Sequence, residues 1–390
     1  MSGTSPVDAA SREAPGSHEG ALWRARLEAS GQNPLSAAEA RAFAGFALDK
    51  VSRTFALNIR VLPEPLRDQV LHAYLYCRMA DTIEDDAALP ASEKERLLEA
   101  FSAVFDPSLS PAEAEPRFAA FPALLPPEWR APFLAEGDWE RLLLAYAPVA
   151  LRAFPEFPAP ARAAIARCVR EMCAGMADFA KRTESRKAEG RALIETLEEL
   201  DAYCYYVAGT VGVMLCDLFV AHARIPEATA ARMRALCVSF GLGLQLTNIL
   251  KDVGDDRERG VSWLPPGVST AGLFLKARGH LDEALEYSIL IPRRQRRLRL
   301  FCLWPLFMTA ETLSLLAQDS HGPAHFGRPE LRGDLGHQRV KMTRARVKRI
   351  VLRTGLLYFS NTWLRAEFRS LLRRLDAAFP PNPSSRAAAR

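Results

Sequence analysis

The sequence predicts an all-α protein, a single domain of packed helices around a central cavity. Hydrophobic residues make up 49% of its 390 residues, which is enough for a substantial core. Between breaks rich in Pro and Gly, apolar residues recur every three or four positions, as they do on one face of a helix. The sequence shows no convincing strand pairs, internal repeat or βαβ pattern. Together these observations favour a helical bundle.

The expected helices lie between two tails. Residues 1–35 are rich in Ser, Gly, Pro and Ala and are expected to form a disordered tail, and residues 377–390 read as a polar C-terminal tail. The folded domain therefore spans residues 36–376, and Ser36 is expected to cap its first helix, over 36–50. The other long helices are expected at 165–183, 193–221, 227–253 and 300–316, among Pro-rich breaks at 106–136 and 154–160 and a loop at 320–337.

Charge and cysteine usage narrow the class of protein. The formal net charge of +5 is too small to indicate a nucleic-acid partner and fits anionic small molecules or an anionic membrane surface. The seven cysteines occur singly and form no CxxC, so we expect reduced core residues of a cytoplasmic protein.

Residues 1–20 lack the apolar segment of a secretory signal. The longest apolar runs, 203–220 and 300–316, are interrupted by Asp217 and Glu311, and we expect buried core helices there rather than membrane spans.

The first acidic motif lies in the segment 74–86. Tyr74, Arg78, Asp81 and Asp85 are spaced four, three and four residues apart, so on a helix they lie on one face. A solvated helix face is the simpler alternative for acids at this spacing. Against it, the segment begins with a mostly apolar run, and two carboxylates near a buried surface would stay protonated without a cation. Oxygen ligands at this spacing suit Mg²⁺ that bridges to a phosphate.

The second motif lies in the segment 241–260. Gln245, Asn248, Asp252 and Asp256 are spaced three, four and four residues apart and form another polar stripe on a mostly apolar helix. Buried polar groups need partners, and an internal hydrogen-bond network is the simpler alternative. Two such stripes that faced each other would bring together four carboxylates, which makes sense only around divalent cations. A diphosphate is the natural ligand of such a cluster, and the chain has no P-loop motif.

At these residues the sequence resembles the squalene/phytoene synthase family. The resemblance covers roughly residues 37–320, and its matching segments occur in the family's order. They are 52–55 (SRTF), the motif from Tyr74 to Asp85, 175–179 (GMADF), 203–212 (YCYYVAGTVG), and 245–252 (QLTNILKD) followed by Asp256. The resemblance implies a helical bundle of the isoprenoid synthase type around a deep apolar cavity.

The resemblance also implies roles for the motif residues. The ligands of Mg²⁺ would be Asp81, Asp85, Asn248, Asp252 and Asp256. The substrate contacts would be Ser52, Arg53, Phe55, Tyr74, Arg78, Tyr206, Gln245, Asn248 and Lys251, among which Ser52, Arg53 and Arg78 would touch the diphosphate. Tyr203 would lie near the carbon that ionises. Lys251 stands where the family usually has Arg. A lysine ammonium acts as a point charge and cannot donate two parallel hydrogen bonds as a guanidinium does.

The chemistry that the family performs agrees with these residue types. Diphosphate leaves poorly until metal ions and cationic side chains neutralise its charge, and its departure leaves an allylic cation. An apolar cavity protects that cation from water, and the aromatic faces of Phe55, Tyr203 and Phe301 stabilise it by about 1–2 kcal/mol each. Core packing is the simpler alternative for each ring. The resemblance then implies attack by a second prenyl chain to give a cyclopropyl intermediate.

Within the family, residues 301–305 (FCLWP) and 340–344 (VKMTR) look more like the squalene synthase branch. Phe301 would then line the pocket in which the intermediate rearranges, and Lys341 and Arg344 would lie near the phosphates of NADPH; a basic helix end is the alternative for these two cations. The expected reaction is the condensation of two farnesyl diphosphates, with Mg²⁺, followed by reduction to squalene by NADPH.

Several alternatives stay open at this stage. The chain could stop at or hydrate the cyclopropyl intermediate, could be a phytoene or dehydrosqualene synthase that takes farnesyl or geranylgeranyl diphosphate without a reductant, or could be an inactive assembly factor. The four motif aspartates argue against the last. We expect a monomer without nucleic-acid partners. The polar tail contrasts with the C-terminal membrane anchor of eukaryotic squalene synthases. Basic clusters at 293–299 and 344–349 could contact anionic lipid, and a solvated face is the simpler alternative for them.

Overall fold

The computed structural model describes residues 17–52, 55–130, 133–258, 263–318 and 342–379, although the side chains of 254–258 are not described. Every regular element in these ranges is helical, so the prediction of an all-α fold is confirmed. The helices are α1 (Ser17–Glu28), α2 (Ala37–Val51), α3 (Phe55–Arg60), α4 (Leu66–Asp85), α5 (Ala91–Ala103), α6 (Pro111–Ala120), α7 (Trp139–Ala145), α8 (Ala147–Leu151), α9 (Ala159–Ala188), α10 (Leu197–Cys204), α11 (Thr210–Ala223), α12 (Glu227–Glu258), α13 (Thr270–Leu290), α14 (Arg296–Gln318), α16 (Arg344–Leu357) and α17 (Asn361–Ala378).

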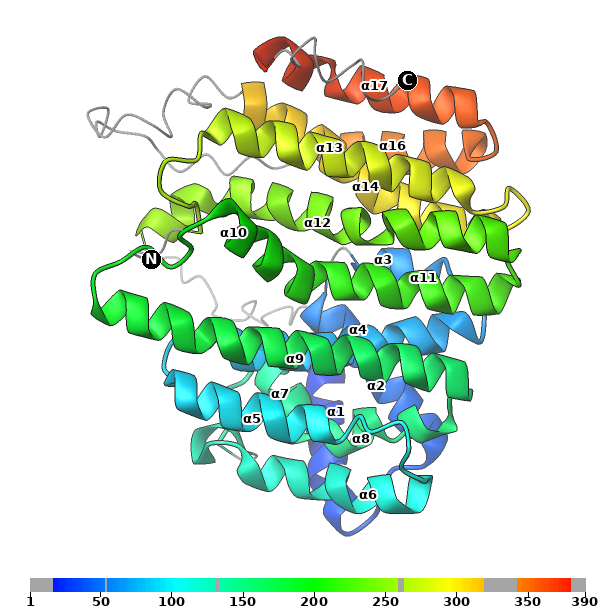
Figure 1. Cartoon of the computed structure of the whole chain (residues 1–390). Helices are drawn as coiled ribbons and strands as arrows, with labels where there is room; N and C mark the ends of the chain where they lie inside the picture. The colour runs from blue at the N-terminus through cyan, green and yellow to red at the C-terminus, as the bar shows by residue number, and fades with distance from the viewer. Residues whose placement is uncertain (1–16, 53–54, 131–132, 259–262, 319–341, 380–390) are drawn as a thin grey trace, which may run out of the picture.

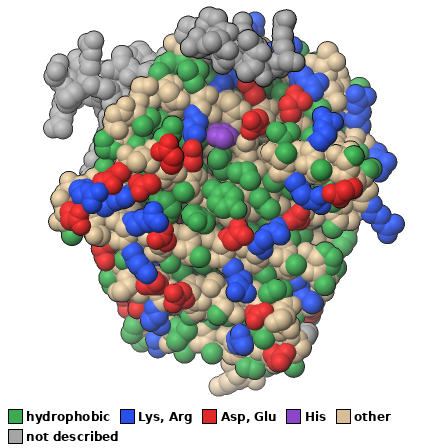
Figure 2. Space-filling view, in the orientation of Figure 1, with side chains coloured by type: hydrophobic (Ala, Val, Ile, Leu, Met, Phe, Trp, Pro, Cys, Tyr) green, Lys and Arg blue, Asp and Glu red, His purple; other side chains and the backbone are tan. Residues whose placement is uncertain are grey.

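The long helices stack as successive layers (Figure 1). From α5 through α9, α11, α12 and α13 to α17 they run roughly side by side, and α4 lies behind α9. Helix α12 lies at the centre of the bundle and packs against α11, α13 and α14. Seven cysteines are free and buried in this core, as expected. On the face in Figure 2, acidic and basic side chains are interspersed among apolar ones, as is usual for a surface in contact with water.

The N-terminal boundary of the folded part differs from the prediction. Residues 17–31, which the sequence analysis placed in a disordered tail, form α1 and a short 3-10 turn. Trp23 and Leu27 lie four residues apart on one face. The Trp23 ring lies 5.6 Å from that of Phe43, and Leu27 is fully buried, so apolar docking overrides the polar composition. The Ser36 cap is confirmed, because its Oγ accepts from the Glu39 backbone N–H at 3.2 Å.

The expectation that no segment qualifies as a membrane span is wrong by length and composition. Three helical stretches, Leu197–Ala223, Glu227–Val253 and Arg296–Ala317, have mean hydropathies of 1.7, 1.3 and 1.6. The single acids Asp217 and Glu311 are too few to lower these averages. The buried share of the apolar window is 50%, 61% and 78% in the three stretches, so protein contacts cover most of the third.

Close packing of α11 against α12 depends on two glycines. A Cβ atom on Gly241 would lie 2.1 Å from the carbonyl oxygen of Ala208, and a Cβ on Gly212 would lie 2.2 Å from that of Cys237. These neighbours are backbone atoms, which cannot rotate away. The two helices can therefore approach this closely only with glycine at both positions.

We expect Gly241→Ala to lower the free energy of unfolding by about 2–4 kcal/mol, because α12 must move away from the backbone of Ala208, just before α11, to admit the methyl group. Gly279→Ala is the matched control, since a Cβ there meets nothing within 4 Å, and it should stabilise α13 by about 0.5–1 kcal/mol. Urea unfolding of both variants measures the difference. Equal stability of the two variants would contradict the packing described.

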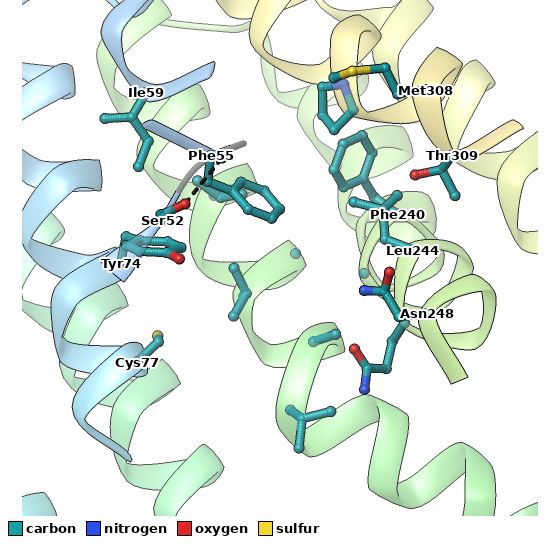
Figure 3. Close-up of a pocket in the computed structure, with 18 of the residues that line it drawn as sticks. Ser52, Phe55, Ile59, Tyr74, Cys77, Phe240, Leu244, Asn248, Met308 and Thr309 are labelled. Atoms are coloured by element: carbon teal, nitrogen blue, oxygen red, sulfur yellow. Dashed lines mark hydrogen bonds between the residues drawn. The ribbon is translucent and has the colours of Figure 1, made fainter. Parts of the chain in front are cut away.

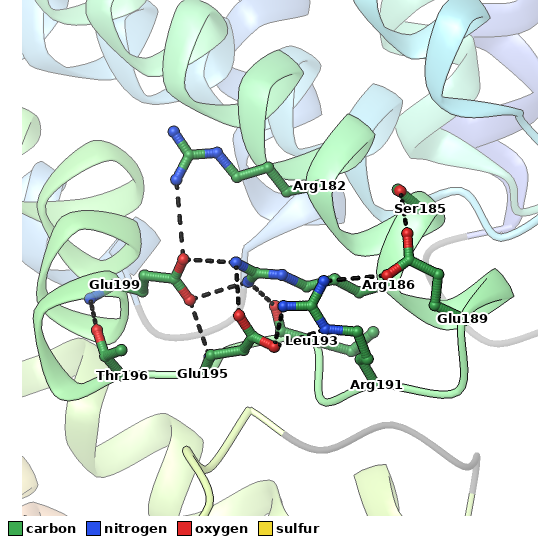
Figure 4. A network of polar contacts seen from close by, with 9 residues as sticks. All are labelled: Arg182, Ser185, Arg186, Glu189, Arg191, Leu193, Glu195, Thr196 and Glu199. Atoms are coloured by element: carbon green, nitrogen blue, oxygen red, sulfur yellow. Dashed lines mark hydrogen bonds and ion pairs between the residues drawn. The ribbon is translucent and has the colours of Figure 1, made fainter.

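A half-buried ion-pair network joins α9 to the start of α10 (Figure 4). The Arg186 guanidinium donates to both carboxylate oxygens of Glu199, at 2.9 and 2.6 Å, and to the carbonyl of Leu193 at 2.9 Å. The Glu195 backbone N–H donates to Glu199 at 2.8 Å. These bonds, that of Arg186 above all, lower the pKa of Glu199 from 4.5 to about 2.

We expect Glu199→Gln to cost about 1–2 kcal/mol of unfolding free energy at neutral pH. Because folding depresses this pKa, the stabilisation is present above pH 4.5 and is lost as the pH falls from there toward about 2. Urea unfolding at a series of pH values should show the gap between wild type and variant narrowing in that window. The control is Glu115→Gln at an exposed position. If this variant lost as much unfolding free energy as Glu199→Gln, the ion-pair network would not account for the loss.

Candidate active site

One cavity of about 780 Å³ lies inside the bundle and collects residues from helices far apart in the sequence. Figure 3 shows Ser52, Phe55 and Tyr74 on one side, facing Phe240, Leu244 and Asn248 of α12 on the other. The third wall is α14, with Met308 and Thr309 among its lining residues. Nine of the predicted site residues line this cavity: Ser52, Phe55, Tyr74, Arg78, Asp81, Gln245, Asn248, Lys251 and Phe301.

The wall formed by α2 to α4 carries a cationic group. Arg78 lies with its Nη2 3.3 Å from the hydroxyl of Tyr74, to which it donates, and its Nη1 is 3.8 Å from an oxygen of Asp81. The Nε of Arg78 is buried without a hydrogen-bond partner among the described residues. The Ser52 hydroxyl accepts from the backbone N–H of Phe55 at 3.1 Å, which leaves its own proton free to donate. Both side chains can therefore donate to an anion in the cavity.

Acidic side chains gather at the end of α4. Loss of hydration raises the pKa of Asp81 to about 7, with Arg78 opposing and Asp85 and Glu140 adding to the rise. Burial and the neighbouring Asp85 raise the pKa of Glu84 to about 8. Carboxyl groups whose pKa values are raised in this way bind protons or cations readily near neutral pH. Glu84 was not predicted, because it falls one residue off the Asp81–Asp85 stripe.

The α12 wall presents Gln245, Asn248 and Lys251 to the cavity. Asp252 does not line it; one of its oxygens lies 3.4 Å from the ammonium of Lys251. Asp256 lies at the end of the same helix, where side chains are not described. Of the four carboxylates predicted to converge, Asp81 lines the cavity and Asp85 and Asp252 do not, so their convergence stays a prediction.

Tyr203 lies beside the acidic group rather than on the cavity wall. Its ring stacks on Trp263 with centroids 4.5 Å apart and an interplanar angle of 16°, and Phe179 meets it edge-on at 5.4 Å. Burial, and then the charges of Glu84 and Asp85, raise its pKa well above the usual value. Trp263 was missed, because nothing in the sequence links it to a residue 60 positions earlier.

Tyr206 belongs to a single π-helical turn, Tyr205–Gly209, that joins α10 to α11. It does not line the cavity. Its ring occupies the space that Gly175 leaves open, since a Cβ on Gly175 would lie 2.1 Å from the Tyr206 Cγ. The sequence predicted one continuous helix here; the extra residue of a π-turn has no periodic signature.

The apolar end of the cavity lies against α14. Phe301 is 3% exposed and meets Phe219 edge-on at 5.6 Å, so it serves the core as well as the cavity wall. Pro305, Met308, Thr309 and Thr312 continue the lining. These four residues were not predicted, although their spacing from Phe301 follows one helix face and would have identified them.

The residues predicted to bind NADPH are described only in part. Lys341 lies outside the described residues, as does Arg53, which was predicted to touch the substrate diphosphate. Arg344 is exposed in the first turn of α16 and does not line the cavity, whereas Met342 and Val347 on either side of it do. Arg344 makes no ion pair with any described residue and is free to meet an anionic group.

The donor set fits Mg²⁺. Among the described residues, no three His, Cys, Asp or Glu side chains form a complete metal site. Mg²⁺ typically takes one or two carboxylates and fills its remaining positions with water and substrate phosphates. Asp81 and Asp85 supply such carboxylates, and burial, which raises the pKa of Asp81 to about 7 despite the neighbouring Arg78, leaves Asp81 with little water to stabilise its charge. The arrangement can thus hold a metal-bound diphosphate at one end and apolar chains at the other.

Comparison with known proteins agrees with this geometry. A family model described as squalene/phytoene synthase matches residues 48–272. The squalene synthase of Schizosaccharomyces pombe is 32% identical over 209 residues, which cover 54% of this chain and 40% of that protein. That of Rattus norvegicus is 30% identical over 221 residues, 57% of this chain and 45% of that protein. These matches span less than half the length of either relative.

Solved structures extend the likeness over more of the chain. A complex of TcSQS with a ligand superposes with a TM-score of 0.67 and 25% identity, over 88% of this chain and 93% of that one. A dehydrosqualene synthase in complex with a ligand superposes with a TM-score of 0.51 and 22% identity, over 83% and 98%, which shows a shared fold alone.

Proposed function

Because the chain belongs to the squalene/phytoene synthase family, we propose that it is a prenyltransferase that joins two molecules of farnesyl diphosphate head to head. The observation that carries the proposal is one cavity that is cationic and acidic at one end and apolar elsewhere. Its volume of about 780 Å³ lies high in the range of small-molecule pockets, about 300–1,000 Å³, and suits two long prenyl chains. The names of the curated relatives favour squalene as the product.

The residues around Arg78 are proposed to bind the diphosphate. Its guanidinium, with an unpartnered Nε, and the free hydroxyl proton of Ser52 donate to the phosphate oxygens, and Lys251 adds a positive charge from the opposite wall. Asp81 and Asp85, with Asn248, Asp252 and Asp256, would hold Mg²⁺ against the same diphosphate. The bound metal neutralises the charge that develops on the leaving group.

Loss of diphosphate leaves an allylic cation in the cavity. The apolar side chains of α11, α12 and α14 keep water away from it. Phe55 and Phe301, on two different walls, offer ring faces to the cation, and Tyr203, held by Trp263 beside the acids, keeps a neutral phenol there. A double bond of the second farnesyl diphosphate then attacks this cation, and loss of one proton closes the cyclopropane ring; the diphosphate of the second molecule stays on the intermediate.

The second step is proposed to use NADPH. Phe301 would line the space in which the intermediate rearranges after loss of its remaining diphosphate, and bound NADPH would supply the hydride that completes squalene. Arg344, exposed and without an ion pair among the described residues, lies next to the cavity-lining Met342; it fits a cofactor phosphate by charge, and Lys341 is proposed to join it. The cofactor supplies the hydride; the chain supplies the dry cavity and the anchoring cations.

We expect removal of divalent metal to abolish turnover. With farnesyl diphosphate as the substrate, release of pyrophosphate should fall to background in excess chelator and return fully when Mg²⁺ is restored. The reason is that uncoordinated diphosphate is a poor leaving group. Undiminished pyrophosphate release in chelator would overturn the metal assignment, and unchanged helical circular dichroism in the same buffer is the control for folding.

A further inference from the structure

We propose that the outer face of α16 docks on an anionic lipid bilayer. This outer face comprises Lys348, Arg349, Leu352, Leu356 and Phe359, the last just beyond the helix end. Leu352 is 64% exposed, Leu356 63% and Phe359 50%, which places three large apolar side chains in water. Their spacing of four and three residues puts them on one line along the helix.

The two faces of α16 are opposite in character. Ile350 and Thr354 are buried and Val347 is half-buried, and Val347 also lines the cavity together with Met342. Leu352 and Leu356 lie about half a turn away from these residues around the helix. One helix thus separates the apolar end of the cavity from the exposed apolar line.

Basic residues dominate the surroundings of the exposed line, although Arg353 pairs with Glu367 of α17 at 2.9 Å. Helix α16 carries five Lys or Arg residues and no Asp or Glu. Lys348 and Arg349 are exposed and form no ion pair with any residue that the structure describes. In contrast to the mixed face in Figure 2, this surface offers uncompensated positive charge.

A second basic group extends the surface at the C-terminal end of α16. The Arg296 guanidinium lies 5.4 Å from the ring centroid of Tyr358 and donates to the carbonyl of Gly355 at 3.4 Å. This contact places the start of α14 beside Leu356 and Phe359. Arg293, Arg294 and Arg297 at the same end are exposed and, among the described residues, without ion pairs.

Apolar side chains ringed by Lys and Arg match the interface of an anionic bilayer. Leu and Phe enter the boundary between headgroups and acyl chains, while each Lys or Arg gains from the negative surface potential. The substrates carry long prenyl chains and the product is a hydrocarbon, so a lipid surface next to the cavity wall offers both a source and a destination. This last argument rests on the proposed function; the charge and exposure pattern does not.

The test is co-sedimentation of the full chain with vesicles, without substrate. One set contains phosphatidylcholine alone, and the other mixes it with phosphatidylglycerol. The wild type should bind the anionic vesicles, more weakly as salt rises, and bind the neutral ones little. The triple variant Leu352→Ser, Leu356→Ser, Phe359→Ser should bind at least about tenfold more weakly.

Two further variants make the test specific. Lys348→Glu with Arg349→Glu keeps the apolar line and should also lower anionic binding by about tenfold or more. Leu124→Ser with Phe133→Ser removes exposed apolar side chains elsewhere and should bind like the wild type. Thermal unfolding of each variant separates lost binding from lost fold.

Three results would overturn the proposal. They are equal binding by the wild type and a folded triple variant, no binding of the wild type to anionic vesicles, and a dimer in sedimentation velocity that the triple variant abolishes, which would make this face a contact between two copies. Since no turnover is measured, a failure of the proposed reaction would leave these results unaffected.

Discussion

Asp81→Asn should reduce kcat with farnesyl diphosphate by about a thousandfold or more. The substitution removes a carboxylate from the group that we propose holds the metal-bound diphosphate, and metal stabilisation of a leaving group is worth several kcal/mol. Asparagine has nearly the same shape, and the pKa of Asp81 is already raised to about 7 by burial, so loss of its charge should not unfold α4. Helical circular dichroism and thermal unfolding should match the wild type.

The control for this variant is Asp217→Asn, which breaks an exposed ion pair with Arg167 on the outside of α9 and α11. Its turnover should be close to that of the wild type. Comparison at several Mg²⁺ concentrations adds a second readout, because a weakened metal site shifts the Mg²⁺ dependence of Asp81→Asn to higher concentration. Wild-type activity of purified Asp81→Asn would remove α4 from the metal site.

Arg78→Ala should lower kcat/KM by about a hundredfold or more, through both a higher KM and a lower kcat. The guanidinium faces the cavity between Tyr74 and Asp81, and a charge-assisted hydrogen bond to a phosphate is lost at both the ground state and the transition state. Removal of the cation should also raise the pKa of Asp81 further, because Arg78 is the group that opposes the rise.

Arg78→Lys distinguishes charge from geometry. A lysine keeps a positive charge but not the fork of donors, so the variant should recover part of kcat/KM without reaching the wild type. Arg232→Ala, at an exposed position near the start of α12, is the control for loss of an arginine. Equal KM values for wild type and Arg78→Ala would exclude contact between Arg78 and the diphosphate.

The spacing of residues in the sequence predicted which side chains share one face of a helix. The four-three-four pattern around Arg78 placed Tyr74, Arg78 and Asp81 on one face of α4, and the structure confirms that all three line the cavity. The stripe on α12 likewise placed Gln245 and Asn248 on that cavity. The helical period alone fixes these positions once the helix exists.

Packing between distant segments was beyond the sequence pattern. The stack of Trp263 on Tyr203, the docking of α1 through Trp23, and the close approach of α11 to α12 at Gly241 each depend on a partner far away along the chain. Propensity and period carry no information on such partners, and composition alone misplaced residues 17–31 in a tail. The mean hydropathy of α14 does not distinguish a helix covered by other helices from a helix covered by lipid.

Product analysis by mass spectrometry tests the central claim most directly. The purified chain would be incubated with farnesyl diphosphate and Mg²⁺, with and without NADPH. We expect presqualene diphosphate in the absence of NADPH and squalene in its presence. A C30 hydrocarbon or alcohol formed regardless of NADPH would contradict the reductive step, turnover of geranylgeranyl diphosphate alone would contradict the substrate, and no condensation product from either diphosphate would contradict the proposed activity as a whole.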